Sequence, residues 1–496
     1  MYGRTVDIEK LFKKFCHVKK DFENNLLKGE DDTYFLNILK YGICIRGISI
    51  ISNMLGDNFD SVSVDIDARV IIENCAIITA LNKKIITFKQ YLIAAISSLY
   101  TSDKRFLILY GSYLTKEQKG WFEKYISDDL ERLQVITNES KEELLKDIST
   151  PFSFLKYEES TKDLKVSNFI TESIGEFHEK MRKFFSFNIH PSYYSKENFE
   201  KVSNIRKGYV GYLLEELDES FEKYDFDLSK IQSYSEYANE LLNDEDFHDL
   251  EVLSNIFDDT FKESDGMTIY VFKKIKCLLI DIFITGNLIS WSYASGRIKI
   301  LYEYCSMLFH VKKTETEKLW QILSDFNSYF VLNKGGSFDF KMRQLMHEIV
   351  NESKNRHNHL KQCEDNYIEK MNKTSLLFFV YGERLSFSKM VRDCAYSISL
   401  NEEIAPIYCN FYEKSLNENH ASFNHLTAKG ATNFKKLGKL VKTYTLGFVY
   451  DLYYTLIGKP GSVIDRDFIF LNTLKFLMDK SLIFDMVEFY LGKKRN

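Results

Sequence analysis

The sequence predicts an all-α protein built from two related helical bundles in tandem. Three observations support this prediction: the scarcity of proline, apolar residues at helical spacing along most of the chain, and a partial internal repeat. The chain has 496 residues and 4 prolines, whereas about one residue in 20 is proline in an average protein. Because proline interrupts helix interiors, this composition permits long helices. The chain also exceeds the roughly 250–300 residues at which a single core stops growing, so at least two domains are expected.

Composition excludes several protein classes and suggests a compartment. Apolar residues make up 45% and charged residues 28% of the chain, which excludes collagen-like, disordered and small disulfide-stapled proteins. The formal charge is 66 − 71 = −5, so nucleic acid or an anionic membrane could be bound only locally. The eight cysteines are scattered without a C-x-x-C pair, and the first residues lack the apolar stretch of a signal peptide. We therefore expect reduced thiols and a cytoplasmic protein.

The first part of the chain is expected to be helical. Apolar residues at helical spacing predict a helix over residues 35–55, which Gly56 and Asp57 end. Residues 67–81 are apolar on nearly all sides, which predicts a central helix. Strand-like runs, such as residues 105–113, are short and isolated, so they do not alter the all-α prediction.

An acidic and polar stretch over residues 231–265 divides the chain. It predicts a first helical domain over residues 1–240, an acidic linker over 241–262 and a second, divergent helical domain over 263–496. We call the two predicted domains the first half and the second half.

Residues 277–294 form the most membrane-like run of the chain. They include Asp281 and Asn287 and continue into Arg297. A spanning helix needs roughly 20 mostly apolar residues, and a carboxylate inside a membrane is costly. The run is therefore expected to be a buried helix, and no membrane association is predicted.

The two halves share sequence features at a constant offset of 230 residues. RVIIENCAII, residues 69–78, falls on KILYEYCSML, residues 299–308, and aligns Glu73 with Glu303. Three further blocks match at the same offset: Lys162-Asp163 with Arg392-Asp393, Glu172 and Ile174 with Glu402 and Ile404, and His190 and Ser192 with His420 and Ser422. Four ordered blocks without a shift favour tandem duplication of one helical domain.

Arg69 and Glu73 stand four residues apart, so on a helix they share a face and can pair. Their apolar surroundings predict partial burial, where loss of one partner would leave an uncompensated charge. The pair recurs as Lys299 and Glu303. Because lysine does not reproduce the geometry of arginine, this recurrence favours framework ion pairs over a catalytic role.

His190 follows an expected helix over residues 173–187 and precedes Pro191. A histidine near a helix end could act as a general base, because imidazole titrates near neutral pH. It could equally bond the last carbonyl groups of the helix. His420 occupies the equivalent place in the second half, and both interpretations stay open for this pair.

Residues 343–364 contain several histidines and arginines. Arg356, His357 and His359 could contact phosphate or RNA, and His359 could share a metal with Cys363 four residues later. The H-E-x-x-H zinc motif is absent. A solvated polar helix face is the favoured interpretation, so no metal site is predicted.

The densest basic region lies near the C-terminus and includes Lys435, Lys436 and Lys439. Interleaved aromatic residues there could stack on RNA bases, although a solvated helix face is again favoured. A Walker loop, a Rossmann glycine pattern, a G-x-S-x-G motif and a paired zinc framework are all absent from the sequence. Most nucleotide-hydrolysing, dehydrogenase and hydrolase classes therefore lose support, and no cofactor is predicted.

Two motifs resemble a known family. An R-x-x-x-E motif on an apolar helix (ARVIIENCAII) and an aromatic-rich helix end followed by H-P-S (FFSFNIHPS) are similar to an uncharacterised family of bacterial helical proteins. That family is related to the HEPN superfamily of helical nucleotide-binding domains. The resemblance covers about residues 30–200 and, more weakly, 265–425. It implies an all-α bundle that often pairs with a second copy.

For some HEPN members the resemblance also implies a metal-independent RNase of toxin, CRISPR or phage-defence systems. Such RNases use Arg-x(4–6)-His, with the arginine at the phosphate and the histidine as acid or base across a two-domain cleft. No arginine here has that spacing, because Arg182 and His190 are separated by seven residues, Arg343 and His347 by three, and Arg356 and His359 by two.

The resulting functional hypothesis is a tandem HEPN-like protein of a bacterial defence or toxin-type stress system. It would act as an RNA-binding module or a divergent metal-independent RNase, with RNA or a defence protein as partner and homo-oligomerisation left open. In the catalytic version, His190 and His420 are the acid and base, and Arg69 and Arg182 face the phosphate. The alternative is a non-catalytic protein-interaction scaffold with a pseudo-symmetric helical platform. It predicts that His190 and Glu73 are buried and bonded to each other or to the backbone, with no polar cleft between the halves.

Overall fold

The structure is a computed structural model, and it confirms the all-α prediction. It describes residues 7–25, 33–56, 62–91, 93, 96, 100, 104, 107–108, 116–142, 166–189, 191, 196–221, 227–242, 255, 266–289, 291–332, 340–354, 387–399, 404–418 and 431–458. Every regular element among these residues is a helix, and they include no strand. Leu107 and Ile108, which lie in the strand-like run 105–113, are helical.

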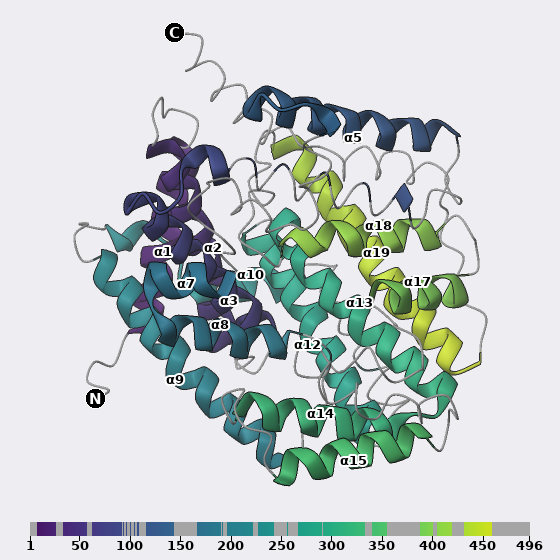
Figure 1. Cartoon of the computed structure of the whole chain (residues 1–496). Helices are drawn as coiled ribbons and strands as arrows, with labels where there is room; N and C mark the ends of the chain where they lie inside the picture. Colours follow the sequence, from purple (N-terminus) through teal and green to yellow (C-terminus); the bar gives the residue numbers. More distant parts are fainter. Residues whose placement is uncertain are drawn as a thin grey trace.

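The helices of each half are labelled in Figure 1. Those that begin before residue 241 are α1 (Ile8–Asn25), α2 (Thr33–Leu55), α3 (Val62–Asn82), α5 (Lys116–Thr137), α7 (Val166–Ile174), α8 (Glu176–Asn188), α9 (Lys196–Phe221), the 3-10 helix η3 (Leu228–Lys230) and α10 (Tyr234–Leu242). Those of the second half are α12 (Gly266–Leu288), α13 (Trp291–Thr314), α14 (Glu317–Leu332), α15 (Phe340–Lys354), α17 (Phe387–Ile398), α18 (Ala405–Glu418) and α19 (Ala431–Leu456).

The predicted helices over residues 35–55 and 67–81 correspond to α2 and α3. α2 ends at Leu55, immediately before Gly56, as the sequence predicts. α3 begins earlier than predicted, at Val62, and carries Asp65 in its first turn, where the helix dipole favours a negative charge. α3 is buried on all sides along most of its length, which is typical of a central helix.

A break at Gly175 separates α7 from α8, where the sequence predicts one helix over residues 173–187. The φ of Gly175 is 101°, an angle that residues with a side chain rarely adopt. The prediction of a continuous helix is therefore wrong. Apolar spacing continues across the glycine and does not reveal the backbone angle.

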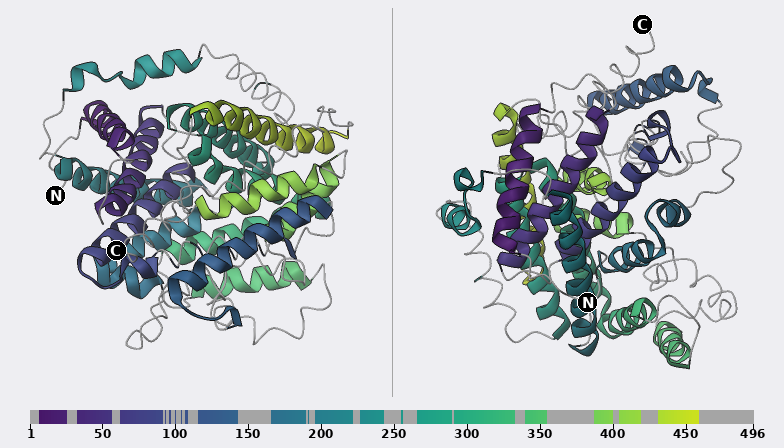
Figure 2. Two further views of the ribbon diagram at one scale, coloured as in Figure 1. Left: turned by 90° about the horizontal axis from the view of Figure 1, so that it is seen from above. Right: turned by 90° about the vertical axis from the view of Figure 1, so that its left-hand side faces the viewer.

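The same packing order occurs in both halves. α3 packs against α2, α7 and α8, and α13 packs against α12, α17 and α18. α12 and α13 lie side by side in the middle of the molecule (Figure 1). α14 and α15 lie against each other at one edge, as Figure 2 also shows, and α14 contacts α8 and α9 of the first half.

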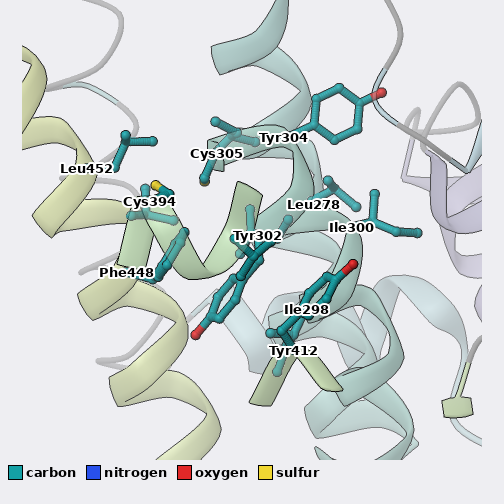
Figure 3. Close-up of a cluster of buried hydrophobic side chains, with 14 of the residues drawn as sticks. Leu278, Ile298, Ile300, Tyr302, Tyr304, Cys305, Cys394, Tyr412, Phe448 and Leu452 are labelled. Carbon is teal, nitrogen blue, oxygen red and sulfur yellow. The ribbon is translucent and has the colours of Figure 1, made fainter. Parts of the chain in front are cut away.

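The buried apolar side chains form two clusters. One gathers residues of α1, α2, α3, α7, α8 and α9, and the other gathers residues of α12, α13, α17, α18 and α19. Figure 3 shows part of the second, where Tyr302 of α13 stacks on Phe448 of α19 with ring centroids 4.0 Å apart. Val62, Ile66 and Val70 of α3 belong to the second cluster as well, so α3 is shared by both cores.

The membrane-like run 277–294 is divided between two helices, because α12 ends at Leu288 and α13 begins at Trp291. Its α12 part is largely buried, as predicted, but the prediction of a single helix over this run is wrong. Of the helices that the structure describes, none is long and apolar enough to cross a membrane.

α10 lies at the boundary between the predicted first domain and the predicted linker. Its last two residues, 241 and 242, fall within the linker 241–262. Tyr234 packs edge-on against Phe12 of α1, with ring centroids 5.6 Å apart. The Tyr237 hydroxyl donates a hydrogen bond of 3.2 Å to the carbonyl oxygen of Ile284 in α12. α10 thus contacts both halves; apart from Asn255, the rest of the linker lies outside the described residues.

Candidate functional site

Four charged side chains, two from α3 and two from α8, lie close together and link these helices. Arg69 Nε donates to Glu73 Oε1 at 3.0 Å, and Arg182 Nη1 lies 3.8 Å from the same oxygen. Arg182 also donates from Nε and Nη2 to the two carboxylate oxygens of Glu179, at 2.8 and 3.1 Å. The structure therefore brings together Arg69, Glu73 and Arg182, which the sequence singled out, and adds Glu179. We call these four residues the α3–α8 charge cluster.

The α3–α8 charge cluster pairs each carboxylate with arginine and is shielded from solvent, and the exposed Lys183 also lies 3.4 Å from Glu179. Its two arginines face two carboxylates, and only 6% of Glu73 is exposed. Burial acts to lower the pKa of Arg182, but the hydrogen bond to Glu179 and the charge of Glu73 outweigh it and raise that pKa. Burial, reinforced by the charge of Glu73, raises the pKa of nearby Tyr91. Arg182 thus stays charged and Tyr91 stays neutral.

A related arrangement lies in the second half. Lys299 Nζ is 3.6 Å from Glu303 Oε1, and the hydroxyl of Tyr412 in α18 donates to the same oxygen at 2.9 Å. Glu303 is fully buried. The structure therefore contains both of the framework ion pairs that the spacing predicts, each of them on a central helix.

A second group of polar side chains joins the two halves. Arg297 of α13 bonds Asp67 of α3 at 2.6 Å and also Asp281 of α12. Arg46 of α2 donates to the other oxygen of Asp67 at 2.9 Å. Asn53 donates to Asp281 at 2.8 Å. All five side chains are buried, and we call them the interhalf network.

Burial makes the interhalf network costly to disturb. Two arginines balance two aspartates. Arg297 also donates to the Ser49 hydroxyl, and the Ser63 hydroxyl donates to Asp281. In a low-dielectric interior such a network holds its members strongly, and an unpaired member would be expensive. Arg206 of α9 adds a separate buried pair, donating to both oxygens of Asp65 at 2.8 and 2.6 Å.

Sequence reasoning did not single out the interhalf network. In the sequence, Asp281 and Arg297 are evidence against a membrane span, and the sequence predicts no charged partner for Arg46 or Asp67. A usable signal was present, because single charged residues interrupt otherwise apolar helices at these positions. Lone charges in buried helices are paired in folded proteins.

Several predicted site residues lie outside the part of the chain that the structure describes. These are His190, His420, Arg356, His357, His359 and Cys363. Lys435, Lys436 and Lys439 lie on α19, but their side chains are also outside the description. Within the described ranges, no three histidine, cysteine, aspartate or glutamate side chains gather in a way that could hold a metal ion.

None of the seven described cysteines belongs to a disulfide, and four of them are buried. Burial raises the pKa of Cys16 and of Cys75 to about 12, and it raises those of Cys44, Cys305 and Cys394 further. Because the thiolate is the nucleophilic form, these residues are suited to packing and not to covalent catalysis.

Comparisons with known proteins give this chain no relative: no family model, no curated protein and no solved structure matches it.

Proposed function

We propose that the chain is a tandem pair of HEPN-like helical domains that works as a non-catalytic protein-interaction scaffold with a pseudo-symmetric platform. The observation that carries this proposal is a contact pattern that repeats at the 230-residue offset. Glu73 is held by Arg69 and Arg182, and the positions 230 residues later are Glu303, Lys299 and Tyr412. Lys299 and Tyr412 hold Glu303 at 3.6 and 2.9 Å.

The helices that carry these residues support the same proposal. α3 and α13 supply the glutamates, while α8 and α18, which start at residues 176 and 405, supply Arg182 and Tyr412. Each pair of helices packs directly together. Under this proposal Arg182 and Tyr412 occupy equivalent positions, and each lies against the glutamate of the central helix in its own half.

The ion pairs that Arg69 and Arg182 make with carboxylates favour a scaffold over a nuclease. A metal-independent RNase needs a cation that is available to the phosphate, whereas Arg69 and Arg182 both lie against carboxylates. Releasing a partner from a buried ion pair costs about 3–5 kcal/mol. The α3–α8 charge cluster therefore supports a framework that holds α3 against α8.

An exchange between the halves tests the tandem relationship. Tyr412, which bonds Glu303, is the proposed counterpart of Arg182, which lies against Glu73. We therefore expect the Arg182→Tyr variant to be more stable than the Arg182→Phe variant, because phenylalanine lacks the hydroxyl that could bond Glu73. The expected difference is about 1–2 kcal/mol in the free energy of unfolding, measured by urea titration of the full chain. Equal stability of the two variants would contradict the equivalence of these positions.

A ribonuclease assay tests the non-catalytic part of the proposal. Incubation of the full chain with labelled single-stranded RNA in the presence of EDTA should give no cleavage above the buffer control. Cleavage that disappears in Arg182→Gln or His190→Ala would overturn the scaffold.

The second candidate is the divergent RNase, and one observation favours it: Arg69 and Arg182, two of its four predicted catalytic residues, meet at one carboxylate. In that version, His190 and His420 supply the acid and base, and His190→Ala and His420→Ala each abolish the cleavage. RNA cleavage that is unchanged in both variants, or absent from the wild type, would contradict this candidate. The defence or toxin-type setting follows from the resemblance alone and stays a prediction.

A further inference from the structure

Aromatic rings from α8 and α9 gather around the exposed side chain of Phe177 on the first half. Phe177 is 56% exposed, and its ring centroid lies 5.5 Å from that of Tyr209 and 6.0 Å from that of Tyr212. His178 Nδ1 is 2.8 Å from the buried Tyr209 hydroxyl. We call Phe177, His178, Tyr209 and Tyr212 the aromatic face. Its rings hold one another in place, while the outer side of Phe177 meets solvent.

At the described positions of α18 that correspond to Phe177 and His178, the second half has no such opening. This step rests on the tandem arrangement proposed above, in which Phe177 corresponds to Ile407 and His178 to Tyr408. Ile407 is only 2% exposed, and Tyr408 is buried against Tyr444 and Phe448 of α19. A position that is closed in one half is therefore open in the other.

Carboxylates border the aromatic face on α9. The Tyr212 hydroxyl donates to Glu216, and this bond, together with burial and the charges of Glu216 and Glu219, raises the pKa of Tyr212 to about 12. On the α8 side, Lys180 is paired with Glu176 at 2.8 Å, so its charge is offset. Glu216 and Glu219 therefore place negative charge beside Tyr212 at the aromatic face.

The surface of α9 is open at Gly211, where a Cβ atom would meet no atom within 4 Å beyond those of its chain neighbours and its own helix backbone. A flat cation such as guanidinium binds well over an aromatic ring beside a carboxylate, because the ring face and the carboxylate both attract positive charge.

We propose that the aromatic face binds an arginine- or lysine-bearing segment of a protein partner, with the cation over Phe177 and Tyr212 and Glu216 as its counter-charge. Aromatic residues with an adjacent charge are typical of the residues that dominate binding energy at protein interfaces. Nucleic acid fits this surface poorly, because Glu216 and Glu219 would repel phosphate groups.

The test uses the full chain and a fluorescein-labelled octapeptide of alternating arginine and glycine, with binding followed by fluorescence anisotropy. An octapeptide of alternating glutamate and glycine is the charge control. We expect the arginine peptide to bind, Phe177→Ala to weaken its binding about tenfold and Glu216→Gln about fivefold. Phe340→Ala is the matched control, because Phe340 is 83% exposed on α15 and its removal should leave binding unchanged.

Several outcomes would overturn the inference. They are no binding of the arginine peptide, equal effects of Phe177→Ala and Phe340→Ala, or Phe177-dependent binding of a single-stranded RNA in place of the peptide. The Arg182→Tyr comparison keeps this test separate from the proposed function. If Arg182→Tyr behaves as expected and the peptide does not bind, only the inference about the aromatic face fails. If the peptide binds through Phe177 and Arg182→Tyr does not behave as expected, the tandem arrangement fails and the binding surface stands.

Discussion

Asp67 and Arg297 form a buried salt bridge of 2.6 Å between positions that are 230 residues apart in the sequence. That separation equals the offset of the predicted internal repeat. In the tandem arrangement proposed above, equivalent residues would meet where the symmetry axis passes through the interface between the halves. Opposite charges at that place favour pairing of the first half with the second, because two copies of either half would bring like charges together.

The interhalf network is expected to be a major source of stability. Asp67→Asn and Arg297→Gln should each lower the free energy of unfolding by about 3–5 kcal/mol, since each leaves a buried charge unpaired. The double variant should lose less than the sum of the two. The coupling energy between Asp67 and Arg297 is obtained from urea titrations monitored by circular dichroism.

The exposed pair Glu176 and Lys180 provides the control for that cycle. Solvent screens surface ion pairs and they contribute little, so Glu176→Gln should leave the unfolding midpoint unchanged. Strictly additive losses from Asp67→Asn and Arg297→Gln would contradict the coupling across the two halves.

Gly47 is expected to resist substitution because of one close contact. A Cβ atom at Gly47 would lie 2.7 Å from Cε1 of Phe15, whose ring is fully buried. Gly47→Ala should therefore destabilise the protein by about 1–3 kcal/mol, measured by thermal or urea unfolding. Adding Phe15→Leu should recover part of this loss, and a double variant less stable than both single variants would argue against a clash.

Alkaline pH is expected to weaken the fold. Burial raises the pKa of Cys16 and Cys75 to about 12 in the folded protein, whereas an unfolded thiol ionises near about 8.5. Between these values the unfolded chain loses protons that the folded chain keeps. The contribution of these buried thiols to the free energy of unfolding is therefore complete below about pH 8.5 and is lost as pH rises toward 12.

Urea midpoints at about pH 7.5 and about pH 10 check this expectation. Cys75→Ala should reduce the fall between the two pH values, because one of the responsible thiols is gone. A midpoint that stays constant or rises with pH would rule the explanation out.

Local features of the fold could be predicted from the sequence. Helix α2 ends where Gly56 follows it, and the pairing of Arg69 with Glu73 depends only on a spacing of four residues on one helix. Both follow from short-range geometry. The break between α7 and α8 was missed because it depends on the φ of Gly175, and apolar periodicity carries no information on that angle.

The long-range contacts could not be predicted in the same way. Apolar spacing shows that α3 is buried, but it does not show that Asp67 meets Arg297 or that Asp65 meets Arg206. Each of these contacts is set by how distant helices cross. The offset of 230 residues does carry information on these contacts, because aligning the halves at that offset matches Asp67 with Arg297 and Arg182 with Tyr412.

α3 supplies Val62, Ile66 and Val70 to one core and Ile71 and Ile72 to the other. A substitution on this helix is therefore constrained by two sets of neighbours simultaneously. In a deep mutational scan we expect the lowest tolerance along α3, and we expect few compensating changes within a single half to restore function there.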